Sequence, residues 1–97
     1  MTIAYLGEMT IESIELADSL RVDDEHSVWF FKTAYQIQDW AEDDEILVLF
    51  ESAFAKEAEE LKSRFITIEV NPEMSNTEIL KAVEDAEKKL STRIPRR

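Results

Sequence analysis

The spacing of apolar residues changes three times between residues 45 and 70, and each spacing is typical of a different element. Residues 46–50 are a continuous apolar run between two glutamates, as in a strand that is buried on both faces of a parallel sheet. Residues 52–64 repeat at helical spacing, and residues 65–70 alternate as in a strand. The helical stripe is Phe54, Ala58 and Leu61, and the inner face of the second strand is Ile66, Ile68 and Val70. The pattern predicts a strand-helix-strand unit.

The first residues predict another strand followed by a helix. Residues 3–7 are a short apolar run that ends on Gly7, the only glycine of the chain. We expect Gly7 to make the turn after this strand, through a positive φ or a close approach of other atoms. Thr10 is a suitable N-cap for a helix, although a strand over residues 11–16 is an alternative. The predicted buried stripe of the helix is Ile11, Ile14, Ala17 and Leu20.

The middle of the first half is rich in aromatic residues. Residues 20–22 predict a very short second strand, and residues 25–41 predict a helix that is apolar over much of its circumference. Trp29 and Trp40 would then lie at nearly the same angle around this helix, at the edge of the core or in a contact patch.

The C-terminal part predicts one more amphipathic helix. Asn71 and Pro72 interrupt the chain, and residues 75–78 match a capping box that opens a helix over 76–91. Its apolar stripe is Ile79, Leu80, Val83, Ala86 and Leu90. Residues 92–97 form a short basic tail. The whole chain, 1–97, therefore predicts a single α/β domain with a body over 1–71. We expect a three- to four-stranded, mainly parallel sheet flanked by helices, in a Rossmann-like or flavodoxin-like arrangement.

The charge of the chain is uneven. The net charge is −11; residues 1–60 hold 16 acids and 3 bases, whereas residues 61–97 hold 6 acids and 8 bases. An acidic body disfavours nucleic acid as a ligand and favours basic protein surfaces. No apolar run is long enough to span a membrane and the first residues lack a basic signal start, so we expect a cytoplasmic protein.

The residues that usually carry chemistry are scarce. The chain has one histidine, His26, and no cysteine, and a single glycine cannot build a phosphate-binding loop. Ser52 follows a strand as a nucleophile would, but without flanking glycines it is better interpreted as a helix cap. Glu51 stands where a phospho-accepting signalling domain has an aspartate. The sequence therefore predicts no catalytic residue, no cofactor and no metal site.

The order of these elements resembles a known family. Residues 3–8 (IAYLGE), a helix containing Leu16-Ala17, a brief strand, an acid-capped helix and residues 46–50 leading into 53–58 (AFAKEA) are similar to the F-subunit family of the V-type and A-type rotary ATPases. The resemblance implies a rotor component without catalytic residues, in which a small α/β domain precedes a C-terminal helix that lies against the coiled coil of the central stalk. It implies that Ile79, Leu80, Val83, Ala86 and Leu90 face the stalk, and that a chain without residues 76–97 keeps a folded body.

Two other interpretations remain open. In the first, the chain is a small acidic inhibitor, immunity or DNA-mimic protein that covers a basic site on an enzyme. The acidic residues that would make this contact are Asp23, Asp24, Glu25, Glu42, Asp43, Asp44 and Glu45. In the second, Trp29 or Trp40 forms the face of a homodimer.

Overall fold

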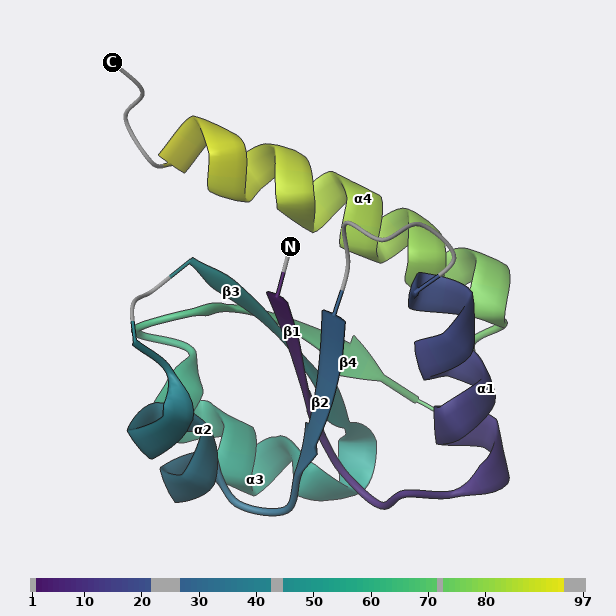
Figure 1. Ribbon diagram of the computed structural model, residues 1–97, viewed down its shortest axis with the longest axis horizontal. Coiled ribbons are helices and arrows are strands. Elements are labelled where there is room, and N and C mark those ends of the chain that lie inside the picture. The colour runs from purple at the N-terminus through teal and green to yellow at the C-terminus, as the bar shows by residue number, and fades with distance from the viewer. Residues whose placement is uncertain (1, 22–26, 43–44, 72, 94–97) are drawn as a thin grey trace.

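The computed structural model describes residues 2–21, 27–42, 45–71 and 73–93. For residues 90–93 it describes the backbone only. Its elements are β1 (Thr2–Leu6), α1 (Ile11–Leu20), β2 (Ser27–Phe31), α2 (Ala34–Trp40), β3 (Ile46–Glu51), the 3₁₀ turn η1 (Ser52–Phe54), α3 (Ala55–Ala58), the 3₁₀ turn η2 (Glu59–Leu61), β4 (Ile66–Val70) and α4 (Asn76–Arg93). The strands form one parallel sheet in the order β2-β1-β3-β4 (Figure 1). The predicted α/β class, with a parallel sheet flanked by helices, is confirmed. Along the described residues, no helix combines the length and apolarity needed to cross a bilayer.

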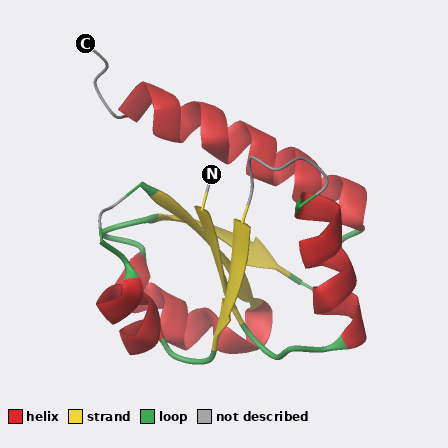
Figure 2. Ribbon diagram, in the orientation of Figure 1, coloured by secondary structure: helices red, strands yellow, loops and turns green. Residues whose placement is uncertain are grey.

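The sheet is the middle of three layers. Helices α1 and α4 cover one face, and α2 and α3 cover the other (Figure 2). The central strands β1 and β3 are buried on both faces, as the continuous apolar run at residues 46–50 predicts. Ile66, Ile68 and Val70 of β4 all lie on the α1/α4 face, which confirms the predicted alternation.

The aromatic stretch is a strand and a short helix, so the predicted helix over residues 25–41 is wrong. Residues 27–31 pair with β1 as β2, and Thr33 caps the new helix α2 by accepting a hydrogen bond from the Gln36 N–H. In β2 the side chains alternate: Val28 and Phe30 pack on the α1/α4 face and Phe31 on the opposite face. Runs of Val, Trp and Phe suit a strand as well as a broad helical stripe, and pairing with β1 favours the strand.

The predicted strand at residues 20–22 is also not observed. Leu20 is the last residue of α1 and Arg21 is its C-cap, while Val22 lies outside the described residues.

Trp29 and Trp40 are neighbours in space, but not because they lie on one side of a single helix, as the sequence predicts. Trp29 lies on β2 and Trp40 ends α2, and their ring centroids are 6.2 Å apart. Trp29 is 53% exposed, whereas Trp40 is half-buried.

Helix α1 begins at the predicted place but presents a different face to the sheet. The Thr10 side chain accepts a hydrogen bond from the Ser13 N–H, and the Ser13 hydroxyl accepts one from the Thr10 N–H, which completes a capping box. The buried face consists of Ser13, Leu16, Ala17 and Leu20. Ile11 and Ile14 are exposed, so half of the predicted stripe is wrong.

The segment after β3 is helical but irregular. The predicted single helix over residues 52–64 consists of a short α3 between two 3₁₀ turns. Ala58 and Leu61 are nevertheless fully buried against the sheet, with Phe54 packed beside them, so the predicted inner stripe is confirmed.

Helix α4 begins as its capping pattern predicts. The Ser75 hydroxyl accepts a hydrogen bond from the Glu78 N–H at 3.2 Å, and the helix starts at Asn76. The helix crosses the face of the sheet beside α1, and its last turns extend beyond the strands (Figure 1).

Candidate functional site

A groove of about 510 Å³ opens at the carboxyl end of the sheet. Its walls come from the ends of β1, β3 and β4 and from the first turns of α1 and α4. After β1 the chain passes to α1 on one face, and after β3 it passes to α3 on the other face, so this is the topological switch point of the sheet. Ligands of open α/β sheets usually bind at such a point. The groove is therefore the first place to look for a functional site.

The Glu51 side chain lines this groove, and two hydrogen bonds hold its carboxylate. One of its oxygens accepts a hydrogen bond from the Tyr5 hydroxyl at 2.8 Å, and the other accepts one from the Glu8 N–H at 3.1 Å. Gly7 makes room for it, because a Cβ at this position would lie only 2.4 Å from Cδ of Glu51. The close approach predicted at Gly7 is thus confirmed, whereas the alternative of a positive φ is not observed at this residue.

The hydrogen bonds and charges around Glu51 disfavour the binding of a phosphate group in the groove. A bound phosphate needs free backbone N–H groups in the loop after β1, and the Glu8 N–H already binds the internal carboxylate. Of the described residues, those that line the groove include Glu12 and Glu51 but no lysine, arginine or histidine. The other lining residues are mainly apolar or carry hydroxyl and amide groups. The groove therefore fits neutral or cationic groups better than anions.

Ser52 also lines the groove, but it is not the helix cap that the sequence predicts. Its hydroxyl donates a hydrogen bond to the Glu69 carboxylate at 2.8 Å, and no side chain caps η1. Among the described residues, no three histidine, aspartate or glutamate side chains converge on one position where a metal ion would bind.

Burial raises the pKa of Tyr5, and the hydrogen bond and charge of Glu51 raise it further. The folded protein therefore holds this proton at a pH at which the unfolded chain releases it. The resulting contribution to stability is complete below the ordinary tyrosine pKa of about 10 and is lost as the pH rises beyond it.

We expect Tyr5→Phe to make the free energy of unfolding decline less steeply above a pH of about 10. Urea denaturation of the wild type and the variant over a series of alkaline pH values measures this slope. Tyr35→Phe is the matched control, because Tyr35 is 74% exposed on the opposite side of the sheet. Equal slopes for the wild type and Tyr5→Phe would show that the Tyr5 proton is not linked to folding.

The predicted partner-binding stripe of the C-terminal helix lies in the core. Ile79, Val83 and Ala86 are 2–4% exposed and pack against Leu47 and Leu49 of β3. Leu80 is half-buried beside them, and the Leu90 side chain lies outside the described residues. The stripe can meet a partner only if α4 leaves the sheet.

The predicted acidic contacts lie mostly outside the described residues. Asp23, Asp24, Glu25, Asp43 and Asp44 belong to the segments that are not described, whereas Glu42 and Glu45 are exposed. These two glutamates line a second hollow of about 400 Å³, together with Thr2, Trp40, Ala41 and Ile46. This hollow lies at the amino end of the sheet, opposite the groove, since Thr2 and Ile46 begin β1 and β3.

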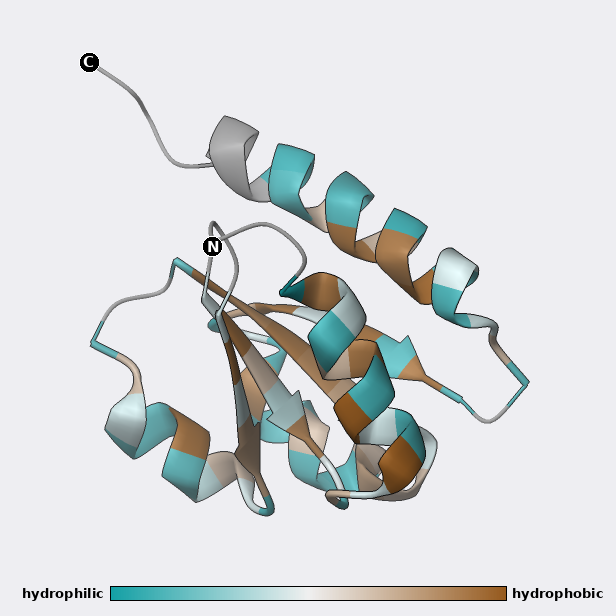
Figure 3. Cartoon of the chain, turned by 45° about the vertical axis from the view of Figure 1, so that its right-hand side comes forward, coloured by the Kyte–Doolittle hydropathy of each residue, from teal (hydrophilic) through white to brown (hydrophobic). Residues whose placement is uncertain are grey.

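Among the described side chains, five large apolar ones are exposed, and most of them were not predicted to belong to a site. They are Met9 (62%), Ile11 (75%), Ile14 (42%), Trp29 (53%) and Tyr35 (74%). The first three lie within six residues at the start of α1, and Figure 3 shows apolar segments on this helix. One signal was present in the sequence: α1 contains more apolar positions than one buried stripe can hold.

Comparisons with known protein families, curated proteins and solved structures find no match for this chain.

Proposed function

We propose that this protein is a non-catalytic, protein-binding subunit of the kind found in the central stalk of a rotary ATPase. The observation that carries the protein-binding role is the exposure of Met9, Ile11 and Ile14 close together at the start of α1, on a domain of only 97 residues. Apolar side chains grouped on a surface, with polar residues around them, are typical of protein interfaces. The assignment to a rotary ATPase rests on the sequence resemblance.

Two structural features support this proposal. The chain has the architecture that the resemblance implies, an α/β body followed by a C-terminal helix. The groove at the switch point is lined by the Glu51 carboxylate and, among the described residues, by no basic side chain, which is unsuited to ATP or another phosphorylated substrate. In this proposal the protein works in the cytoplasm, at the periphery of a membrane complex.

Affinity capture of the tagged, full-length protein from a lysate of its own cells tests the proposal. We expect ATPase stalk and head subunits to be recovered, and their binding to be weakened but not lost at high salt, because salt screens the charged contacts and leaves the apolar contacts in place. Recovery of no ATPase subunit at either salt concentration would overturn the assignment.

A second candidate function is an acidic protein that covers a basic enzyme surface. It is favoured by the hollow at the amino end of the sheet, where exposed Glu42 and Glu45 lie beside the half-buried Trp40. In the same capture experiment, this function predicts one basic enzyme that is lost as salt rises, since the contacts between exposed charges are screened.

A further inference from the structure

We infer that the outward surface of α1 binds an amphipathic helix of the partner whose apolar stripe is flanked by lysine or arginine. This inference rests on the proposed protein-binding function and adds the surface and the chemistry of its ligand. The α1 surface is defined by the apolar residues Met9, Ile11 and Ile14 and by the acidic residues Glu12, Glu15 and Asp18.

The apolar part of the α1 surface lies at the start of the helix. Ile11 and Ile14 are three residues apart and therefore neighbours on the helix surface, and Met9 lies just before the N-cap. The buried face of α1 is already occupied by Leu16, Ala17 and Leu20, so the two isoleucines do not complete the core. They are 75% and 42% exposed, and their burial by a partner would contribute directly to affinity.

The acidic part lies one helical turn further along. Glu15 is four residues after Ile11, and Asp18 is four residues after Ile14, so each apolar residue is followed by an acid on the same side. Glu12 adds a third carboxylate on the flank of α1 that lines the groove. The same ridge of the helix therefore presents apolar contacts first and negative charge next.

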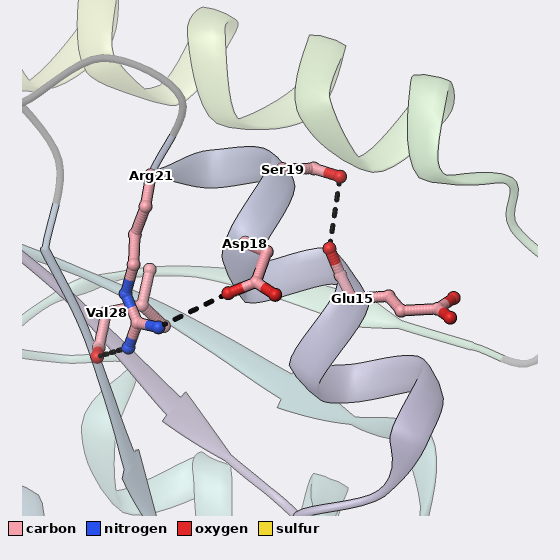
Figure 4. A network of polar contacts seen from close by, with 5 residues as sticks. All are labelled: Glu15, Asp18, Ser19, Arg21 and Val28. Atoms are coloured by element: carbon pink, nitrogen blue, oxygen red, sulfur yellow. Dashed lines mark hydrogen bonds and ion pairs between the residues drawn. The ribbon is translucent and has the colours of Figure 1, made fainter.

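Arg21, the C-cap and only base of the α1 region, does not neutralise this whole surface. Its guanidinium donates a hydrogen bond to the Val28 carbonyl at 2.6 Å and lies 3.7 Å from the Asp18 carboxylate (Figure 4). In the same view the Glu15 carboxylate points away from Arg21, and only the Glu15 backbone carbonyl is engaged, by the Ser19 hydroxyl. Glu12 and Glu15 have no basic partner within the described part of the chain.

Charge complementarity identifies the occupant. An apolar patch rimmed by carboxylates attracts an apolar stripe rimmed by lysine or arginine, and it repels nucleic acid and anionic lipid. A second copy of this chain would oppose the same carboxylates to each other across a two-fold axis, which is unfavourable. A helix is the fitting shape, because anchors at helical spacing can lie along the isoleucine ridge.

The first test uses a synthetic helical peptide with leucines on one face and lysines on the other. We expect it to shift the amide NMR signals of α1, with an affinity that falls as salt rises. The same peptide with glutamate in place of lysine is expected not to bind. Equal binding of both peptides, or shifts centred on α2 and β2, would overturn the inference.

Matched variants separate this inference from the proposed function. We expect Ile11→Ser to weaken peptide binding by about tenfold. We also expect this variant to recover no partner in the affinity-capture experiment. Tyr35→Ser, with nearly the same exposed fraction of 74% against 75%, should leave both unchanged. Glu15→Lys should reduce the salt dependence, whereas Glu84→Lys on the exposed side of α4 should not. If Ile11→Ser and Tyr35→Ser recover equal amounts of partner in the capture experiment, the inference about the α1 surface is wrong, whereas the proposed function still holds.

Discussion

Val83→Asp is expected to lower the free energy of unfolding by about 4 kcal/mol or more. Val83 is 2% exposed and lies in the cluster formed by α4 and β3, so the new carboxylate would be buried without a partner. Such a loss is most of the stability of an ordinary small domain, which is about 5–15 kcal/mol. Urea denaturation followed by circular dichroism measures it.

Lys81→Asp is the control for this prediction. It places an aspartate on α4 at an exposed position. Lys81→Asp changes the net charge by one unit more than Val83→Asp does, so a smaller effect on stability cannot come from a smaller change in charge repulsion. We expect it to change the free energy of unfolding by no more than about 0.5 kcal/mol. Equal urea midpoints for the two variants would show that α4 is not part of the cooperative core.

The outcome for Val83→Asp also decides how the C-terminal stripe is used. If α4 is needed for folding, a chain without residues 76–97 should lose its folded body, because the sheet would be uncovered over β3 and β4. The implied contact between the stripe and a stalk would then require α4 to leave the core. If α4 is dispensable, Ile79 and Val83 become available to a partner, as the family resemblance implies.

Gly7→Ala is expected to lower the free energy of unfolding by about 2–3 kcal/mol. The added Cβ would overlap the Glu51 side chain, so the carboxylate has to move. That movement breaks its hydrogen bonds with the Tyr5 hydroxyl and the Glu8 N–H. Tyr5 is 3% exposed, so its hydroxyl would lose its partner in a largely buried position.

A double-mutant cycle identifies Glu51 as the cause. Glu51→Ala removes the atoms that the new Cβ would meet, so adding Gly7→Ala to it should cost no more than about 0.5 kcal/mol further. The cycle with Glu69→Ala is the control, because Glu69 bonds to Ser52 and is not among the nearest atoms to Gly7. Additive losses in both cycles would show that the overlap at Gly7 does not involve Glu51.

The groove itself was not predicted, although several of its residues were singled out. Thr10, Glu51 and Ser52 each carried a prediction from its local sequence, but Tyr5 and Glu51 are 46 residues apart in the chain and meet only through strand pairing. A search for catalytic spacing cannot detect a carboxylate whose partners are a distant hydroxyl and a backbone N–H. The charge of the α1 surface was visible in the sequence, but its exposed isoleucines were assigned to the core.

The sequence by itself determined the class of the fold, the two central strands, β4 and the start of α4. These features follow from local signals: continuous apolar runs, strict alternation and capping residues have the same meaning wherever the chain places them. The nature of residues 27–31 and the inward face of α1 were decided only by the tertiary structure. An aromatic run suits both a helix and a strand until β1 offers it a hydrogen-bonding edge. A helix with apolar residues on two sides likewise buries the side that fits the sheet, and in α1 that choice leaves Ile11 and Ile14 in solvent.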